Sequence, residues 1–439
     1  MSGNSAALLG FIALILLIGL RMPIGMAMLV VGIGGYISMS SAINFLNYIK
    51  TTPYFLFANY TITVIPLFVL MGALAEQSGL ARDLFAAARS CLGHRKGGLA
   101  MAVIGACTGF GAICGSSVAT TATFGRSALP ELQRYGYAGS FATGTIAAGG
   151  TLGILIPPSV VLVVYAISTE QNIAKLFQAA LVPGLLASLF YCLTIAIVVR
   201  RNPALAPVLA RIPWLERLPA LLAIWPTVTV ALVVLGGIYG GIFTPTEGAS
   251  VGAMAMLVTG LVTRKLDGDK IRRSLRATAE TTAMIFLILL GGEVFNAFLA
   301  LTQMPTNLAE WISGLGLSPP LVMAMLLFSY VLLGAVMDEL AMIILTLPIY
   351  FPLVQALDFG IPPDEVAIWF GILVLIVVGI GLTAPPIGLN VFVVSAIARD
   401  VPINDTYRGV LPYVGADFLS LALVFFMPVV ATGMVRLLN

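Results

Sequence analysis

The stretch "GFGAICGSSVATTATFGRSALPEL", residues 109–132, interrupts an apolar run with Gly115-Ser116-Ser117, three threonines and Arg126. The chain around it is unusually apolar, since 59% of its 439 residues are hydrophobic and 9% are charged, against about 25% charged in an average soluble protein. Apolar stretches of about 20 residues, enough to cross a bilayer, recur from residue 5 to the C-terminus. The composition therefore predicts an all-α polytopic membrane protein with no soluble domain attached.

Several function classes are disfavoured by the residues that are missing. The four cysteines form no C-x-x-C pair and the single histidine, His94, lies in a basic loop, so neither a structural metal site nor a cofactor is expected. No G-x-x-x-x-G-K-[ST] occurs, so no P-loop for ATP is present. The first apolar run, Ala6 to Leu20, has no positive residue before it and no cleavage signal after it, and it is interpreted as a retained helix. Work done by this protein must draw on a gradient or a partner.

The distribution of Lys and Arg predicts the orientation, because positive loops stay on the cytoplasmic side. Basic residues gather in five loops, at residues 82–96, 126–134, 200–217, 264–276 and 399–408. The apolar spans at about 221–240 and 248–263 are then joined by an external loop. Residues 97–125, however, lie between two cytoplasmic loops. They cannot form a single membrane span, because a single span would place its two ends on opposite sides.

A re-entrant hairpin over residues 98–125 resolves this conflict. Its arms are Gly98 to Cys114 and Val118 to Gly125, and its tip is the Gly-Ser-Ser of the opening stretch. Unwound backbone at membrane depth is tolerated only where protein or a water-lined cavity satisfies its polar groups. The tip is therefore expected to line a cavity.

The chain contains a second copy of this arrangement. The segment "SCLGHRKGGLAMAVIGACTGFGAICGSS" has a counterpart in "SGLGLSPPLVMAMLLFSYVLLGAVMDEL", and the spacing from Ser116 to Pro130 equals that from Asp338 to Pro352. Farther along, "GILIPPSVVLVVYAI" matches "GLTAPPIGLNVFVVSAI", with a Pro-Pro pair four residues after a glycine in each. The chain is thus interpreted as a duplication.

Loop charges indicate that the two copies are inverted. Basic loops flank the first hairpin, whereas Glu310, Asp358, Asp364 and Glu365 flank the second without any Lys or Arg. Inverted repeats with interrupted segments at matching positions are typical of secondary transporters and indicate a binding site near the midplane. Residues 1–81 are expected to form N-terminal scaffold helices, and residues 201–280 further scaffold helices and a cytoplasmic linker. The first repeat is expected at 82–200, with a hairpin at 98–125 and a broken helix at 138–168. The second repeat is expected at 281–439, with a hairpin at 319–355 and a broken helix at 366–398.

Each Pro-Pro pair is expected to break its helix, because a proline removes its own N–H and clashes with the carbonyl four residues earlier. The pair Pro157-Pro158 would release the carbonyls of Gly153 and Ile154, and Pro385-Pro386 those of Gly381 and Leu382. Free carbonyls at membrane depth can coordinate Na⁺, and half-helix N-termini can face an anionic substrate. The alternative is a mere kink satisfied by neighbouring helices.

The two tips differ chemically. Ser116 and Ser117 offer hydroxyls and backbone N–H groups at a helix start, which suits a carboxylate. Asp338 and Glu339 could hold a cation or a proton, since an acidic residue within the membrane is a functional hypothesis by default; alternatively, Asp338 caps the second arm. Thr120, Thr121 and Thr123 are expected to back-bond within their helix, and Glu293 has no assigned partner.

Five segments together resemble the large membrane subunit of the TRAP transporters, the tripartite ATP-independent periplasmic family. They are "GAICGSSVATTATFGRSALPEL", "GGTLGILIPPSVVLVVYAI", "GGIYGGIFTPTEGA", "GAVMDELAMIILTLPIYFPL" and "GLTAPPIGLNVFVV". The resemblance covers essentially the whole chain, with the motifs in the right order.

The resemblance implies a multi-pass permease of the bacterial inner membrane that imports small organic acids with a Na⁺ gradient. A periplasmic solute-binding protein would deliver the substrate, and a small four-helix membrane subunit on a separate chain would complete the complex. Family members look like elevators, in which a transport domain holding both hairpins slides against a scaffold. Such a protein is not an enzyme, has membrane lipid but no nucleic acid as a partner, and uses sodium only as the coupling ion.

Site residues follow from the resemblance and from the breaks. Cation-binding candidates are Ser116, Gly153, Asp338, Gly381 and Thr383. Substrate-binding candidates are Ser116, Ser117 and Asn390, the last of which could orient the substrate or a tip. Hinge candidates are Gly115, Pro157, Pro158, Pro385, Pro386 and Gly388.

One departure from the family leaves the substrate open. Relatives that include sialic-acid carriers have an arginine before the second hairpin, and "EVFNAFLALTQMP" has none. Other readings are a stand-alone ion-coupled carboxylate carrier, a channel, and an intramembrane enzyme with Ser116 as nucleophile. The enzyme lacks a histidine or lysine in a membrane segment to act as its base.

Overall fold

The computed structural model describes residues 3–334 and 337–438, and this part of the chain is helical, with no β-strand. The prediction of an all-α protein is confirmed for these residues. Before the first interrupted pair lie α1 (Gly3–Gly19), α2 (Ile24–Met39), α3 (Ala42–Phe57), the 3₁₀ turn η1 (Tyr60–Thr63), α4 (Val64–Gln77) and α5 (Leu80–Leu92).

The next helices match the segments predicted for the first repeat. They are α6 (Gly98–Cys114), α7 (Ser117–Ser127), α8 (Leu129–Arg134), α9 (Gly139–Leu155), α10 (Val160–Ser168) and α11 (Ile173–Arg201). Helices α9 and α10 are bent by 43° across the Pro157-Pro158 break. The predicted break in this helix is therefore present.

The middle of the chain holds the 3₁₀ turn η2 (Pro203–Leu205), α12 (Trp214–Ala223), α13 (Trp225–Tyr239), α14 (Pro245–Val262) and α15 (Gly268–Thr302). The span expected at 221–240 is shorter than predicted, because α12 and α13 meet at an angle of 49°. Pro226 stands in the first turn of α13, where the missing N–H is tolerated, so a new helix begins there. The predicted boundary at residue 280 falls inside the continuous helix α15.

The second half has the same order of elements. It contains α16 (Met304–Gly314), α17 (Pro319–Gly334), α18 (Glu339–Gln355), α19 (Pro363–Thr383), α20 (Leu389–Ile397), α21 (Ile403–Phe426) and α22 (Val429–Leu438). The helix that follows each Pro-Pro break, α10 or α20, has 9 residues. The pairs α6–α7 and α17–α18 thus stand at matching places, and so do α9–α10 and α19–α20.

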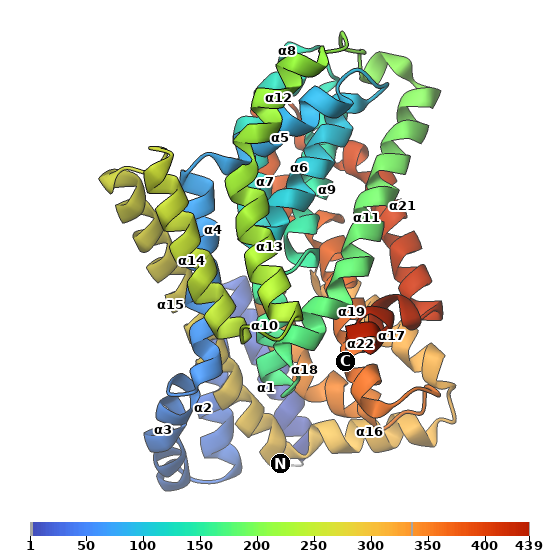
Figure 1. The fold of residues 1–439 in the computed structure, drawn as a ribbon. Coiled ribbons are helices and arrows are strands. Elements are labelled where there is room, and N and C mark those ends of the chain that lie inside the picture. Colours follow the sequence, from blue (N-terminus) through green and yellow to red (C-terminus); the bar gives the residue numbers. More distant parts are fainter. Residues whose placement is uncertain (1–2, 335–336, 439) are drawn as a thin grey trace.

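Five helices in the described residues are long and apolar enough to cross a membrane, or up to seven if each bent pair is one span. Helices α8 and α12 lie at the upper end of the molecule and α16 at the lower end (Figure 1). The flanks of the two interrupted pairs are thus at opposite ends.

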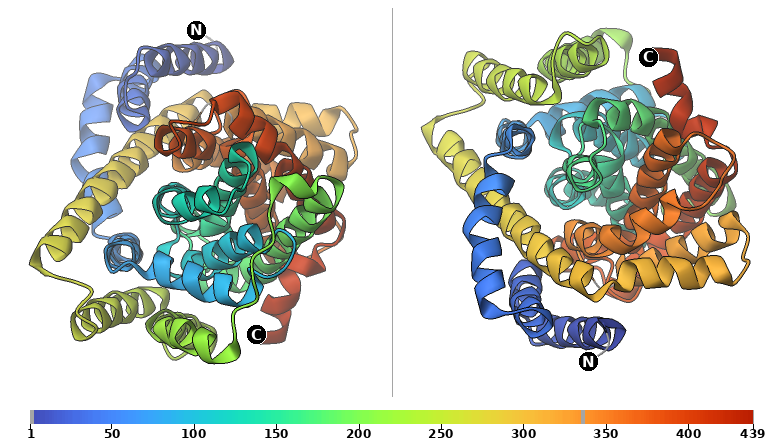
Figure 2. Two further views of the ribbon diagram at one scale, coloured as in Figure 1. Left: turned by 90° about the horizontal axis from the view of Figure 1, so that it is seen from above. Right: turned by 90° about the horizontal axis from the view of Figure 1, so that it is seen from below.

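The centre of the molecule is formed by the two helices that precede the breaks. All residues of α9 from Phe141 to Leu155 are buried, as are those of α19 from Val366 to Thr383, and the two helices pack together. Helix α15 runs along one side, with α1 and α2 outside it (Figure 2). This arrangement surrounds α9 and α19 with protein.

Glycines let α2 and α15 approach at backbone distance. A Cβ on Gly25 would lie 2.9 Å from the backbone of Leu287 and Ile288, and one on Gly291 would lie 3.0 Å from the carbonyl carbon of Gly25. Small residues of this kind allow close helix packing in membranes.

We expect Gly291→Ala to lower the free energy of unfolding by about 1–3 kcal/mol, because the added methyl group must push two backbones apart. Gly34→Ala is the matched control, since a Cβ there meets nothing within 4 Å. Thermal unfolding in detergent measures both variants, and equal midpoints would contradict the close α2–α15 contact.

Candidate functional site

Tip one, defined here as Gly115 and Ser116 between α6 and α7, follows from ordinary helix stop and start signals. Gly115 ends α6 with a φ of 64°, a left-handed conformation that favours glycine. Ser116 is extended, with a φ of −134°, and its Oγ accepts a hydrogen bond from the Ala119 N–H at 3.4 Å. Serine is a preferred N-cap, so the Gly-Ser pair ends one helix and begins the next.

Tip one lies directly on the first helix break. The Val160 N–H donates to the Gly115 carbonyl at 3.4 Å, and a Cβ on Gly115 would lie 2.6 Å from the Pro158 carbonyl oxygen. On the neighbouring helix, a Cβ on Gly153 would lie 2.6 Å from the Ser116 carbonyl oxygen. The structure therefore brings the predicted residues Gly115, Ser116, Gly153 and Pro158 together through backbone contacts.

Asn390 connects tip one to the second repeat. Its Nδ2 donates to Ser117 Oγ at 2.7 Å and to the Ala147 carbonyl at 3.2 Å, and Ser117 Oγ is 3.1 Å from Asn390 Oδ1. Both side chains are fully buried. This geometry places Asn390 beside the start of α7, next to tip one, and its role in substrate binding stays a prediction.

Tip two is defined by Met337 and Asp338, the described residues between α17 and α18. Asp338 is the N-cap of α18, and its Oδ1 accepts from the N–H groups of Leu340 at 3.0 Å and Ala341 at 3.1 Å. Asp338 Oδ1 therefore caps α18, which was the alternative interpretation of this residue. Glu339 Oε2 is buried and has no hydrogen-bond partner in the described residues.

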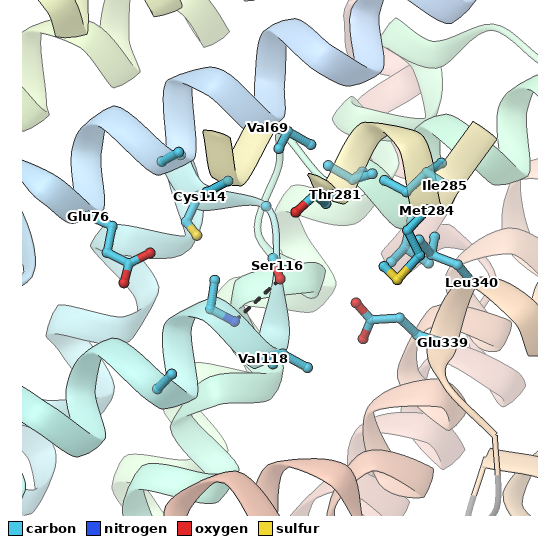
Figure 3. A pocket seen from close by; sticks show the side chains of 18 of the residues that line it. Val69, Glu76, Cys114, Ser116, Val118, Thr281, Met284, Ile285, Glu339 and Leu340 are labelled. Carbon is cyan, nitrogen blue, oxygen red and sulfur yellow. Dashed lines mark hydrogen bonds between the residues drawn. The ribbon is translucent and has the colours of Figure 1, made fainter. Parts of the chain in front are cut away.

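Both tips line one cavity of about 480 Å³. Tip one contributes Gly115 and Ser116, and the start of α18 contributes Asp338, Glu339 and Leu340. Helices α4 and α15 form the opposite wall, with Thr281 and Met284 among the α15 residues. Figure 3 shows Ser116 and Glu339 facing the space from different elements. Gly115 and Ser116 of the predicted Gly-Ser-Ser tip therefore line a cavity, whereas Ser117 is buried against Asn390 and is not part of this lining.

The cavity is also lined by an ion pair that the sequence analysis did not predict. Arg126 Nη2 donates to Glu76 Oε1 at 2.8 Å, and both residues line the cavity. Arg126 had been counted only as a loop charge. Glu76, the single acid near the end of the apolar helix α4, is the signal that could have pointed to the pair.

Other predicted residues lie outside the cavity lining. Thr383 is fully buried and its Oγ1 donates within α19, to Ile380 at 3.1 Å and Gly379 at 3.3 Å. A Cβ on Gly381 would lie 2.7 Å from the Cα of Gly334, so this glycine packs against α17. Gly388 begins α20 with a φ of 56°, after the Pro385-Pro386 break.

The carbonyls after the second break do have a partner. The Tyr407 hydroxyl lies 2.9 Å from the Pro386 carbonyl oxygen and 2.5 Å from that of Ile387. Both contacts are exposed. This tyrosine therefore holds the segment between the proline pair and α20 against α21.

The remaining polar residues behave differently from one another. The Thr120 hydroxyl donates to the Ser116 carbonyl at 2.8 Å, as predicted. The buried Oγ1 atoms of Thr121 and Thr123 have no hydrogen-bond partner in the described residues, so the prediction of back-bonding was wrong for these two.

Partial desolvation, followed by the positive charges of nearby arginines, lowers the pKa of His94 in its loop. The Glu293 carbonyl accepts from the Tyr48 hydroxyl at 3.3 Å.

An all-helical chain whose two interrupted helix pairs close on one cavity belongs to the class of polytopic membrane transporters. Its residues 11–430 match the family model of the DctM component of the tripartite ATP-independent periplasmic transporters. The chain belongs to this family, as the resemblance implied, and it is a transporter permease subunit rather than an enzyme.

Several relatives share most of its length. The C4-dicarboxylate TRAP transporter large permease protein DctM of Pseudomonas aeruginosa is 38% identical over 379 residues, 86% of each chain. The sialic acid TRAP transporter large permease protein SiaM of Vibrio cholerae is 32% identical over 84% of this chain and 85% of the relative. The isethionate TRAP transporter permease protein DctMQ of Oleidesulfovibrio alaskensis is 31% identical over 96% of this chain and 65% of the relative.

Among solved structures, the YdaH transporter of Alcanivorax borkumensis is similar with a TM-score of 0.63. The match covers 87% of this chain and 88% of that chain, at 17% sequence identity. At this identity the likeness shows the fold alone.

We expect Gly153→Ala to impair transport strongly and to lower the free energy of unfolding by about 1–3 kcal/mol, because its methyl group would collide with the tip-one backbone. Uptake and thermal unfolding of the purified protein measure the two effects. Gly105→Ala is the control, since a Cβ on this α6 glycine meets nothing within 4 Å. Normal uptake by the Gly153 variant would show that tip one does not depend on this contact.

Proposed function

We propose that this permease imports small organic acids across the bacterial inner membrane, driven by a sodium gradient, with substrate delivered by a periplasmic solute-binding protein. The observation that carries the proposal is the cavity lined by both tips. Tip one supplies a helix N-terminus and a hydroxyl, whereas Asp338 of tip two and Glu339, the first residue of α18, supply two carboxyl groups. An anion and a cation could therefore bind in the same space.

The substrate end of the proposal rests on tip one and Arg126. Backbone N–H groups at the start of α7 and the Ser116 hydroxyl form a helix N-terminus of the kind that binds carboxylates. Arg126, on the last turn of α7, is the basic residue among those that line the cavity. Relatives are named for C4-dicarboxylates, sialic acid and isethionate, which are small anionic acids, and others for ectoine, a zwitterion that also carries a carboxylate.

The cation end rests on tip two and the helix breaks. Asp338 uses Oδ1 to cap α18, which leaves the rest of its carboxyl group for a cation. Unwound carbonyls beside a half-helix are the usual sodium ligands in transporters with interrupted helices. We assign the coupling sodium ions to Ser116, Asp338 and the backbone at Gly153, Gly381 and Thr383, without a further cofactor.

We infer that transport moves the two interrupted pairs as one body. We take α6, α7, α9, α10 and α17 to α20 as the moving part, and α1 to α4 and α13 to α15 as the scaffold. The cavity lies between these two sets of helices. In this arrangement α6–α7 and α17–α18 are re-entrant hairpins that enter from opposite sides, consistent with the opposite ends at which α8 and α16 lie (Figure 1).

We further propose a separate small membrane subunit as the permanent partner, with lipid around the remaining apolar surface. The proposal is supported by the family description, which names this chain's family as the DctM component of a tripartite transporter. This chain supplies one of the three parts.

The first test is uptake of radiolabelled organic acids into proteoliposomes that contain this chain and the small subunit. We expect saturable uptake that requires both an inward sodium gradient and the cognate binding protein. Omission of either is the control. Gradient-driven uptake without the binding protein would instead establish a stand-alone carrier, and flux proportional to concentration without saturation would indicate a channel.

A second test separates the charge of Asp338 from its capping role. We expect Asp338→Asn to reduce sodium-coupled uptake at limiting sodium by tenfold or more while unfolding remains near wild type, because Asn and Asp are about equally good N-caps. Asp338→Ala should lose uptake and also about 1 kcal/mol of stability. Wild-type sodium dependence in the Asn variant would remove Asp338 from the cation site.

A further inference from the structure

A second buried polar cluster lies between α9, α11 and α21, away from the cavity. The Tyr191 hydroxyl donates to Asp417 Oδ1 at 2.5 Å and is 2.9 Å from Thr151 Oγ1. Asp417 interrupts the apolar helix α21, and it is 6% exposed. An acidic residue so placed in a membrane helix is by default functional.

Two oxygen atoms of this cluster have no hydrogen-bond partner in the described residues. They are Asp417 Oδ2 and Ser420 Oγ, and Ser420 is 3% exposed. Both residues line a small cavity of about 10 Å³, together with Thr151 and Gly379. A space of this size holds about one water molecule or one small ion.

The lining of this small cavity brings no positive charge to the carboxylate. Asp417 is the one charged residue among the residues that line it. A carboxylate without a partner in low dielectric is strongly unfavourable. A bound monovalent cation would reduce this cost and leave the cluster neutral, whereas a divalent ion would leave an uncompensated positive charge.

We propose that Asp417, Ser420, Thr151 and Tyr191 form a further binding site for one sodium ion. Asp417, Ser420 and Thr151 line this space of ionic size, and Tyr191 lies beside it through its hydrogen bonds to Asp417 and Thr151. All four residues offer hard oxygen ligands, from three helices. The site deepens the sodium coupling proposed above, on which it rests, and it adds an ion that does not touch the substrate cavity.

Helix α9 gives this ion a mechanical role. Its Thr151 faces Tyr191, while Gly153, two residues later, contacts the tip-one backbone. An ion bound at Asp417 would fix α9 against α11 and α21, and thereby fix the helix on which tip one rests. Sodium binding there would order the tip before substrate arrives.

The test compares the thermal stability of the purified complex with the small subunit in sodium chloride and in choline chloride of equal ionic strength. Ser420→Ala removes an unpartnered hydroxyl, so we expect it to be at least as stable as wild type in choline and less stable in sodium. For Asp417→Asn we expect the same pattern with a larger difference: stability at least equal to wild type in choline and lower than wild type in sodium. The reason is that ligand binding stabilises only the protein that binds it.

Tyr413→Phe is the matched control. It removes the buried hydrogen bond between Tyr413 and Thr145, 2.7 Å long, which also joins α21 to α9 but lies outside the small cavity. We expect its loss of stability to be the same in both salts. Equilibrium binding of radioactive sodium supplies the second measurement, with one ion fewer per chain in Asp417→Asn than in wild type.

Each outcome has a distinct meaning. This site would be overturned if Asp417→Asn and Ser420→Ala changed stability equally in both salts and the number of bound sodium ions stayed the same. The proposed function would still stand in that case, provided that wild-type stability depended on sodium. Stability of Asp417→Asn that depends on pH and not on sodium would assign a proton to the carboxyl group and also overturn it. Absence of any sodium effect on wild type would reject sodium coupling itself.

Discussion

The backbone of tip one lies directly on the break that follows α9, and the position of the cavity between the two tips depends on this contact. No side chain separates Gly115 from Pro158, or Gly153 from Ser116. Any Cβ at either glycine would force the tip away from α9. The tip is therefore placed by a helix break rather than by its own short loop, and the stiffness of the proline pair is passed to the binding groups.

The two repeats complete each other instead of forming separate sites. Helix α20, which follows the second break, packs against α7 of the first repeat, and α10, which follows the first break, packs against α18 of the second. The Asn390–Ser117 pair is the hydrogen-bonded part of this exchange. Because the half-helix after each break packs against an arm of the other repeat's interrupted pair, the two repeats are joined on both sides of the buried pair α9 and α19.

Much of this architecture could be predicted from local signals. Glycine and proline mark where helices must end, so the bounds of α6, α7, α9 and α10 were close to those expected, and the asymmetric charge of the loops predicted opposite flanks. Contacts between distant side chains could not be predicted. Glu76 meets Arg126 across 50 residues of sequence and Tyr191 meets Asp417 across 226, and neither pair has a spacing that one helix would impose. Only one member of each pair, Glu76 or Asp417, carried a signal, as an acid in an apolar helix.

The strength of contacts differs between the inside of the proposed moving body and its border with the scaffold. Inside the body, Asn390 of α20 donates to Ser117 of α7 and the Tyr165 hydroxyl of α10 donates to the Ala367 carbonyl of α19, both buried, and separating such groups costs about 1–3 kcal/mol each. At the border, Gly72 of α4 lies against the backbone of Cys114, and Gly292 of α15 lies against the Ile344 side chain. These are van der Waals contacts without a side-chain hydrogen bond. The Glu76–Arg126 ion pair there is largely exposed on the arginine side, and such pairs contribute about 0–1 kcal/mol. A body held firmly inside and loosely at its border can slide as a unit, and the cavity at that border is where substrate would be carried.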